Sequence, residues 1–237
     1  MNYRIMGELP HHGRYLPFGR LTRMAVAKQH TVNKRIRKTP EERRREIVDA
    51  AVRLIGEKGY YGTSLREIAQ AVGMSQPGLL HYAGTKEGLL SMLVTDAYDA
   101  SGTIDDFIAT GLPGSDPDNL FFPAYLRYLV RHNAQRVELM RLYMILETEA
   151  FSPDHPLHEY FDDRPNRTWH YYSSYQWRIP PQMGQWSESM RPVVRQCIEA
   201  MDGVQLRFMR RPPIDLVDEW IIFERMIFPS PMWDRYR

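Results

Sequence analysis

The sequence has 237 residues, 43% hydrophobic and 25% charged, which is typical of a globular protein with one large domain or two small ones. No apolar run approaches the ~20 residues of a membrane span, and the N-terminal segment lacks the continuous apolar stretch of a secretory signal. The single cysteine, Cys197, excludes an intrachain disulfide and a four-cysteine zinc site. A cytoplasmic protein with no membrane partner is therefore expected.

The net charge of +2 conceals an uneven distribution of charge along the chain. Residues 1–40 hold nine of the 31 basic residues but one of the 29 acidic ones, which leaves 22 basic and 28 acidic residues for the remainder. A basic N-terminal arm on a mildly acidic body indicates a polyanionic partner. A solvated tail with no partner explains the same pattern equally well.

The N-terminal segment shows no sustained helical or strand periodicity. Pro10, Gly13, Pro17 and Gly19 interrupt each candidate helix. Residues 1–33 are therefore predicted to be a disordered basic extension, in which Met24 is an alternative native start.

The first helix is predicted to begin after Thr39 and to end at Gly59. The stretch "TPEE" places Thr39 at the N-cap and Pro40 at the first helical position, with Glu42 three residues after the cap. Apolar residues then recur at helical spacing: Ile47, Ala50, Ala51, Leu54 and Ile55.

Two short helices with a glycine between them are predicted to follow. Ser64 and Glu67 form a second capping pattern, and Gly73 ends the helix that they open. Ser75 then caps the next helix, in which Pro77 occupies the first turn. The spacing predicts a helix-turn-helix within a domain spanning residues 34–85, with Leu79 facing inward.

The rest of the chain, residues 86–230, is predicted to be a second, all-helical domain. Proposed helices cover 86–108, 119–133, 136–150, 166–177, 187–209 and 214–227, with a short one starting near Leu157. Segments rich in glycine and proline separate them. The expected fold is therefore all-α, with no strand of useful length.

The second helix of a helix-turn-helix enters the major groove, while its surroundings contact phosphates. Gln76 is suited to hydrogen-bond adenine, and Pro77 with Gly78 permits close apolar approach. Helix N-termini and basic side chains supply phosphate contacts. The predicted DNA-binding residues are Lys34, Arg35, Arg37, Lys38, Thr63, Ser64, Ser75, Gln76, Pro77, Gly78, His81, Tyr82 and Lys86.

The stretch "IVDAAVRLIGEKGYYGTSLREIAQAVGMSQPGLLHYAGTKEGLL" resembles the DNA-binding domain of the TetR family of bacterial transcriptional regulators. The resemblance covers about a quarter of the chain and implies a homodimer that releases a palindromic operator when a small-molecule effector binds. Two positions depart from the family pattern: Leu80 replaces a frequent phosphate-binding tyrosine, and Ala83 replaces a packing phenylalanine. Tyr82 is therefore the better candidate for that phosphate contact.

The resemblance implies that the C-terminal helices form an effector pocket and a dimer interface. Aromatic and methionine side chains suit a cavity wall, with a polar anchor such as Glu147 or His132, although plain core packing explains them too. The candidate pocket residues are Tyr125, Tyr128, His132, Met140, Tyr143, Met144, Glu147, Tyr171 and Tyr175. The candidate dimer residues, on the last two helices, are Val194, Cys197, Met201, Val204, Phe208, Trp220, Phe223 and Ile227.

Neither a cofactor nor a metal site is predicted, because a turn with solvated side chains explains His155 and His158 better than metal binding. The function favoured by the sequence is a ligand-responsive repressor, with double-stranded operator DNA and a second copy of the chain as partners. An activator and a non-specific DNA-coating protein of the same fold remain alternatives. A helical enzyme using Glu147 and His132 as acid and base lacks any supporting motif.

Overall fold

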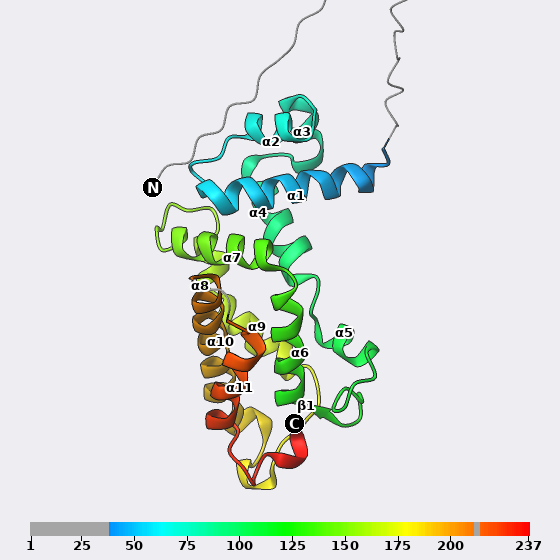
Figure 1. Ribbon diagram of the computed structural model, residues 1–237, viewed down its shortest axis with the longest axis vertical. Coiled ribbons are helices and arrows are strands. Elements are labelled where there is room, and N and C mark those ends of the chain that lie inside the picture. The colour runs from blue at the N-terminus through cyan, green and yellow to red at the C-terminus, as the bar shows by residue number, and fades with distance from the viewer. Residues whose placement is uncertain (1–37, 211–213) are drawn as a thin grey trace, which may run out of the picture. The chain divides into compact units, whose positions relative to one another are not determined.

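The computed structural model describes residues 38–210 and 214–237 (Figure 1). The described residues belong to a single unit, Lys38–Arg237. The predictions made for residues 1–33 and for Lys34, Arg35 and Arg37 lie outside the described residues.

Helix α1 (Pro40–Lys58) begins where the capping pattern predicts. The Thr39 hydroxyl accepts the backbone N–H of Glu42 at 3.1 Å, and the Glu42 carboxylate accepts the backbone N–H of Thr39 at 2.7 Å. These reciprocal bonds satisfy two amide groups that the first helical turn leaves without partners. The face carrying Ile47, Ala51 and Ile55 is buried.

Helices α2 (Leu65–Ala71) and α3 (Gln76–Ala83) confirm the predicted helix-turn-helix. Ser64 caps α2 through a second reciprocal box with Glu67, and Ser75 caps α3 by accepting the backbone N–H of Gly78. Gly73 has φ +64°, and a Cβ there would meet nothing within 4 Å. Glycine therefore serves this turn through its backbone conformation and not through its small size.

The continuous helix expected over 86–108 is wrong. The chain forms α4 (Lys86–Ser91), a π-helical segment η1 (Met92–Asp99) and, after a break, α5 (Ile104–Ala109). Gly102 has φ +76°, which no helix accommodates, and Thr103 caps α5 by accepting the backbone N–H of Asp106. The break therefore has a local cause that helical periodicity alone conceals.

The remaining helices confirm the all-α class. They are α6 (Phe122–Ala134), α7 (Val137–Glu149), α8 (His158–Asp162), α9 (Arg164–Ser173), α10 (Trp186–Arg210) and α11 (Leu216–Ile227), with 3-10 turns η2 (Pro181–Met183) and η3 (Asp234–Tyr236). Extended structure within the described ranges is limited to a parallel pairing of β1 (Leu120–Phe121) with β2 (Trp177–Arg178). None of the helices in this part of the chain is long and apolar enough to cross a membrane.

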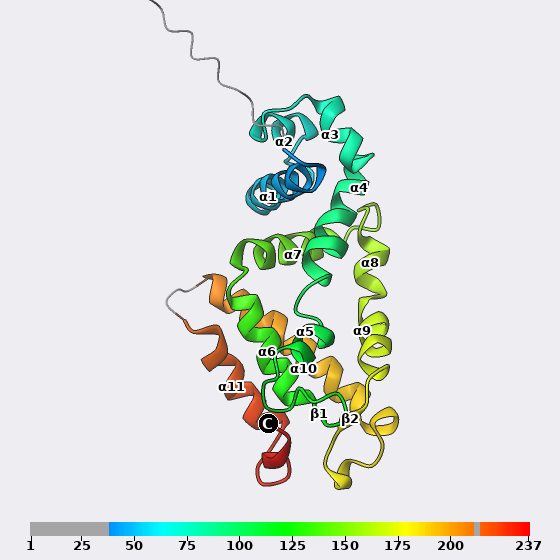
Figure 2. The same cartoon turned by 90° about the vertical axis from the view of Figure 1, so that its right-hand side faces the viewer.

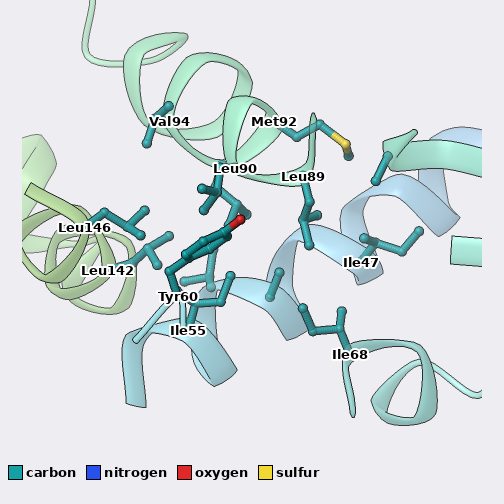
Figure 3. Close-up of a cluster of buried hydrophobic side chains, with 14 of the residues drawn as sticks. Ile47, Ile55, Tyr60, Ile68, Leu89, Leu90, Met92, Val94, Leu142 and Leu146 are labelled. Carbon is teal, nitrogen blue, oxygen red and sulfur yellow. The ribbon is translucent and has the colours of Figure 1, made fainter. Parts of the chain in front are cut away.

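Two buried clusters hold the helices together. The first joins α1, α2, α3, α4 and η1 to α7, and Figure 3 shows Tyr60 near its centre, with Leu142 on one side and Ile47 on the other. Helix α1 lies between α2 and α7, so the helix-turn-helix rests on α7 through α1 (Figures 1 and 2). The second cluster joins α5, α6, α9, α10 and α11 and includes Trp220 and Trp233.

An ion pair ties α6 to α11 inside the second cluster. The Arg127 guanidinium donates to both carboxylate oxygens of Glu224, with Nε at 3.1 Å from Oε2. The Glu224 side chain is 1% exposed, so its charge has little access to water. A bidentate partner is what makes such burial tolerable.

Candidate nucleic-acid interface and ligand cavity

Helix α3 is anchored on one side and open on the other. Leu79 is fully buried, which confirms its inward assignment, and Ala83 is also buried. Ser75, Gln76, Pro77 and His81 are exposed on the other side, whereas Gly78, Leu80 and Tyr82 are half-buried. The polar end of α3 is therefore exposed to solvent, while the core residues beneath α3 fix the position of the helix.

The exposed side of α3 has the character that a DNA-reading helix requires. Gln76 offers an amide with both a donor and an acceptor, and His81 adds a ring whose edge packs against the Tyr82 ring at 5.6 Å between centroids. The predicted contacts at Ser75, Gln76, Pro77, Gly78, His81 and Tyr82 remain predictions, since nothing is bound to the helix.

Thr63 does not have the exposure that a phosphate contact needs. Its side chain is 1% exposed, and its hydroxyl donates at 2.9 Å to the carbonyl oxygen of Gly59, with Leu54 O at 3.2 Å. The hydroxyl thus closes the turn between α1 and α2. Ser64 is exposed, but its hydroxyl is engaged with Glu67 as the cap of α2.

Lys86 is also turned toward the protein. Its ammonium donates to the carbonyl oxygen of Tyr60 at 2.7 Å and lies 4.1 Å from the centroid of the Tyr60 ring. Burial lowers the pKa of Lys86. The side chain therefore stabilises the junction of the α1–α2 loop with α4, which leaves it poorly placed to meet the DNA backbone as predicted.

Two of the basic groups near the helix-turn-helix are already paired with acids. Lys38 forms an ion pair with Glu46, and Lys58 forms one with Glu67 at 2.8 Å. Arg66, at the second position of α2, is exposed and forms no ion pair within the described ranges. Arg66 was not among the predicted DNA-binding residues; it lies about 200° around α2 from the buried Ile68, on the solvent side.

The helix-turn-helix is connected to the helical body at Tyr60. The backbone N–H of Tyr60 donates to the Glu149 carboxylate at the end of α7, at 2.8 Å, and its hydroxyl donates to Glu87 at 3.1 Å. Burial raises the pKa of the Tyr60 hydroxyl to about 12. Tyr60 thus joins α4 and α7 at one point.

The body contains a cavity of about 310 Å³ lined by residues of η1, the segment that follows it, α6, α9 and α10. Its volume lies at the small end of the ~300–1,000 Å³ that ligand pockets occupy. Aromatic and aliphatic side chains form much of the wall. They are Tyr98, Tyr125, Leu126, Leu129, Tyr171, Tyr172, Ile198 and Met201.

Few of the residues predicted for the pocket line this cavity. Tyr125 and Tyr171 do so, and Met201, which was assigned to the dimer interface, lines it as well. The other predicted pocket residues are not among the lining residues: Tyr128, His132, Met140, Tyr143, Met144, Glu147 and Tyr175. Tyr143 illustrates the reason, because it stacks on Tyr98 with centroids 4.0 Å apart, and Tyr98 is the residue that reaches the cavity.

Charged groups lie at one side of the cavity. Arg164 and Asp202 line it, and Glu147 is close enough to influence both. Burial raises the pKa of the Asp202 carboxyl to about 7, against the opposing attraction of Arg164. Burial likewise raises the pKa of Glu147. Arg164 and Asp202 were not predicted as pocket residues, because a charged residue next to a proline or on an amphipathic helix is usually solvent-facing.

A hydrogen-bonded network borders the cavity where η1 ends. The Arg136 guanidinium donates to the carbonyl oxygens of Ala97 and Tyr98 and lies 2.6 Å from Nε2 of His132. Burial, followed by the charge of Arg136, lowers the pKa of His132. The cavity therefore adjoins the C-terminal end of the segment that begins with α4.

The predicted dimer residues are largely covered within one chain. Val194, Cys197 and Trp220 are buried in the second cluster, and burial raises the pKa of the Cys197 thiol. Val204, Phe208, Phe223 and Ile227 are half-buried against the same cluster. The exposed apolar side chains of α10 and α11 are different ones: Leu206 at 39%, Ile222 at 61% and Met226 at 76% exposure. Because the predicted residues are covered by the chain itself, these three exposed residues become the candidates for a dimer surface.

The histidine pair near α8 is used within the protein. Nδ1 of the buried His155 accepts the backbone N–H of Leu157 at 3.2 Å, and Nδ1 of His158 lies 2.8 Å from the carbonyl oxygen of Ala150. No group of three or more potential metal ligands occurs in the part of the chain that the structure describes.

The sequence of the N-terminal helices matches a known protein family. Residues 47–93 match the family model for bacterial regulatory proteins of the TetR family. These residues run from the buried face of α1 to the start of η1 and contain the whole helix-turn-helix.

Curated relatives match over the same region. The chain is 36% identical over 62 residues to the HTH-type transcriptional regulator HbdR of Aromatoleum sp. (strain CIB), which covers 26% of this chain and 27% of HbdR. It is 31% identical over 99 residues to the HTH-type transcriptional repressor Rv1474c of Mycobacterium tuberculosis, which covers 42% of this chain and 50% of the repressor. The chain thus matches about a quarter to a half of the length of these relatives.

Solved structures resemble the fold more extensively. The fatty acid degradation regulator FadR from Bacillus halodurans aligns with a TM-score of 0.58 over 85% of this chain and 100% of FadR, at 19% identity. A TetR-like transcriptional regulator from Rhodococcus sp. RHA1 aligns with a TM-score of 0.50 over 81% of this chain and 96% of that chain, at 18% identity. At such identities the likeness concerns the arrangement of the helices.

Proposed function

Since the chain belongs by its N-terminal domain to the TetR family of bacterial transcriptional regulators, which are not enzymes, we propose that it is a homodimeric repressor released from a palindromic operator by a small-molecule effector. The observation that carries the proposal is α3. Its apolar side is anchored by Leu79, while Gln76 and His81 are exposed at the end that would meet base edges.

A dimer supplies the second recognition helix. Two copies related by a twofold axis would place their α3 helices about one turn of DNA apart, on the order of 34 Å, as a palindromic operator requires. Leu206, Ile222 and Met226 are the side chains that such a dimer would cover. Replacing Ile222 and Met226 by lysine should give a monomer in sedimentation analysis, whereas an unchanged mass would argue against this surface.

Effector control would act through the segment from α4 to η1. It starts directly after the helix-turn-helix and ends at the cavity, where Tyr98 lines the wall. A ligand shifts a conformational equilibrium only through unequal affinity for the two states. An effector would therefore favour a conformation of the protein in which α4 holds α3 in a position that does not fit the operator.

The test is DNase footprinting and band-shift analysis on the DNA upstream of the gene. A specific regulator should prefer its operator over random DNA by a factor of about 10³ or more. Gln76→Ala should weaken operator binding by about 10-fold, since a bidentate contact to adenine contributes ~1–3 kcal/mol. Gln182→Ala, an exposed glutamine in η2, is the matched control and should bind as the unmodified chain does.

The same assays separate the alternatives. Equal affinity for random and upstream DNA would identify a non-specific DNA-coating protein and overturn the proposed repressor. A footprint accompanied by higher transcription of the regulated gene would indicate an activator of the same fold.

A further inference from the structure

The Arg164 guanidinium differs from the other cation at the cavity. Arg167 donates to the carbonyl oxygen of Tyr160 at 2.9 Å and lies 3.8 Å from the Asp163 carboxylate. Arg164 lines the cavity with its guanidinium carbon 4.8 Å from the centroid of the Tyr143 ring. Within residues 38–210 and 214–237, the Arg164 guanidinium forms neither a hydrogen bond nor an ion pair.

An arginine in such a position has unused donors. A guanidinium carries five N–H groups in a rigid fork, and those of the half-buried Arg164 are left for an acceptor that enters the cavity. The ring of Tyr143 interacts with the charge but accepts none of the in-plane N–H groups. A planar anion with two oxygens matches the fork best, because both oxygens are bonded at once.

Nearby acids limit the charge that the site tolerates. Asp202 and Asp99 line the cavity, and Asp99 already accepts the Tyr160 hydroxyl at 2.5 Å. Asp202 is beyond ion-pair distance from Arg164, and burial raises its pKa to about 7, which lessens its repulsion of an anion at neutral pH. A monoanion therefore suits the site, whereas a dianion meets two carboxyl groups that oppose it.

The rest of the cavity lining favours a ligand with an apolar body. Tyr125 and Tyr172 pack edge to face at 5.6 Å between centroids, and Leu126, Leu129 and Ile198 extend the surface. Their polar atoms are largely satisfied, since the Tyr125 hydroxyl donates to the carbonyl oxygen of Gly102 at 3.2 Å. This wall offers dispersion and ring contacts rather than further charge.

We propose that the cavity binds a small carboxylic acid with an aromatic or compact apolar body, its carboxylate held by the fork of Arg164 and its body placed between Tyr125, Tyr172 and the neighbouring aliphatic side chains. This inference rests on the proposed function, in which the cavity is the effector site. It assigns to that site a ligand class and an anchoring residue.

Isothermal titration calorimetry on the full chain tests the ligand class with three probes that share a phenyl ring and differ in the polar group: phenylacetate, its neutral amide phenylacetamide, and phenyl phosphate. Phenylacetate should bind at least ~10-fold more tightly than either of the others. Equal or tighter binding of phenylacetamide would show that the negative charge of the ligand does not contribute to binding. Tighter binding of phenyl phosphate would replace the carboxylate by a phosphate. Absence of phenylacetate binding at a concentration of about 10 mM would overturn the proposal.

Variants test the anchoring residue. Arg164→Gln should lose phenylacetate binding, and Arg164→Lys, which keeps the charge but loses the fork, should weaken it by about 10-fold or more. Arg178→Gln, at an exposed arginine in β2, should bind phenylacetate normally. Unchanged affinity in Arg164→Gln would overturn the assignment. If that variant does not fold, the comparison of probes on the unmodified chain still decides the ligand class.

Footprinting keeps the two hypotheses apart. A footprint without phenylacetate binding would contradict the ligand class and leave the regulator intact. Phenylacetate binding that depends on Arg164, without a footprint on any upstream DNA, would contradict the regulator and leave the binding site intact.

Discussion

The two buried clusters are organised by contacts of different range. Around the first cluster, helices α1, α2, α3 and α4 each begin with a cap between residues three apart, as at Thr39 and Glu42 or at Ser64 and Glu67. In the second, Arg127 meets Glu224 from 97 residues away. The helix starts of the helix-turn-helix are therefore specified by local sequence, whereas its contact with α7, like the Arg127–Glu224 pair of the body, forms only once the chain has folded.

The largest effect should come from breaking the long-range pair. Arg127→Gln would leave the Glu224 carboxylate buried without its partner and should lower the free energy of unfolding by about 3–5 kcal/mol in urea titrations. The control is Arg141→Gln, at an exposed arginine that pairs with Glu138 three residues away. It should change stability by less than about 1 kcal/mol. Similar losses of stability in both variants would show that the buried, long-range ion pair contributes no more than the exposed, local one.

The next largest loss of stability is expected when a core side chain of the helix-turn-helix is truncated. Leu79→Ala removes a fully buried side chain and should cost about 3 kcal/mol, because the transfer free energy is lost and a cavity remains. Leu80→Ala, at the half-buried neighbour, should cost clearly less in the same thermal and urea unfolding measurements. A greater loss from Leu80→Ala would reverse the assignment of the inward face of α3.

A backbone effect of intermediate size is expected at the turn. Gly73→Ala should destabilise the protein by about 1–2 kcal/mol, since φ is positive although the space around it is open. Gly203→Ala is the matched control because its Cβ would also meet nothing within 4 Å, but it lies within α10. It should stabilise the helix by about 0.5–1 kcal/mol in thermal unfolding.

The smallest effect concerns pH and the network beside the cavity. Burial and the charge of Arg136 lower the pKa of His132, so the unfolded chain takes up a proton more readily than the folded one. Stability should therefore decline as pH falls below 6.5, the ordinary histidine value. Urea titrations of His132→Gln should show a shallower decline over that window. Identical slopes for the two proteins would contradict this role of His132.

The accuracy of the sequence predictions follows the range of the interactions. The caps at Thr39, Ser64 and Ser75 predicted three helix starts, because each capping hydroxyl and the backbone N–H that donates to it lie within one turn. The continuous helix over 86–108 was wrong, because the apolar spacing persists through Gly102 while the backbone there does not remain helical. The sequence predicts a phosphate contact for Thr63, whereas its hydroxyl closes the preceding turn by donating to Gly59.

By itself the sequence determined the all-α class, the helix-turn-helix and the inward position of Leu79, since caps, glycine turns and helical periodicity act within a few residues. Only the tertiary structure decided which side chains reach the cavity, that Arg164 stands there without an acceptor among the described residues, and that Cys197 and Trp220 are covered by the chain's own residues. A helix sequence reveals which of its faces is apolar, but not which distant helix will cover that face.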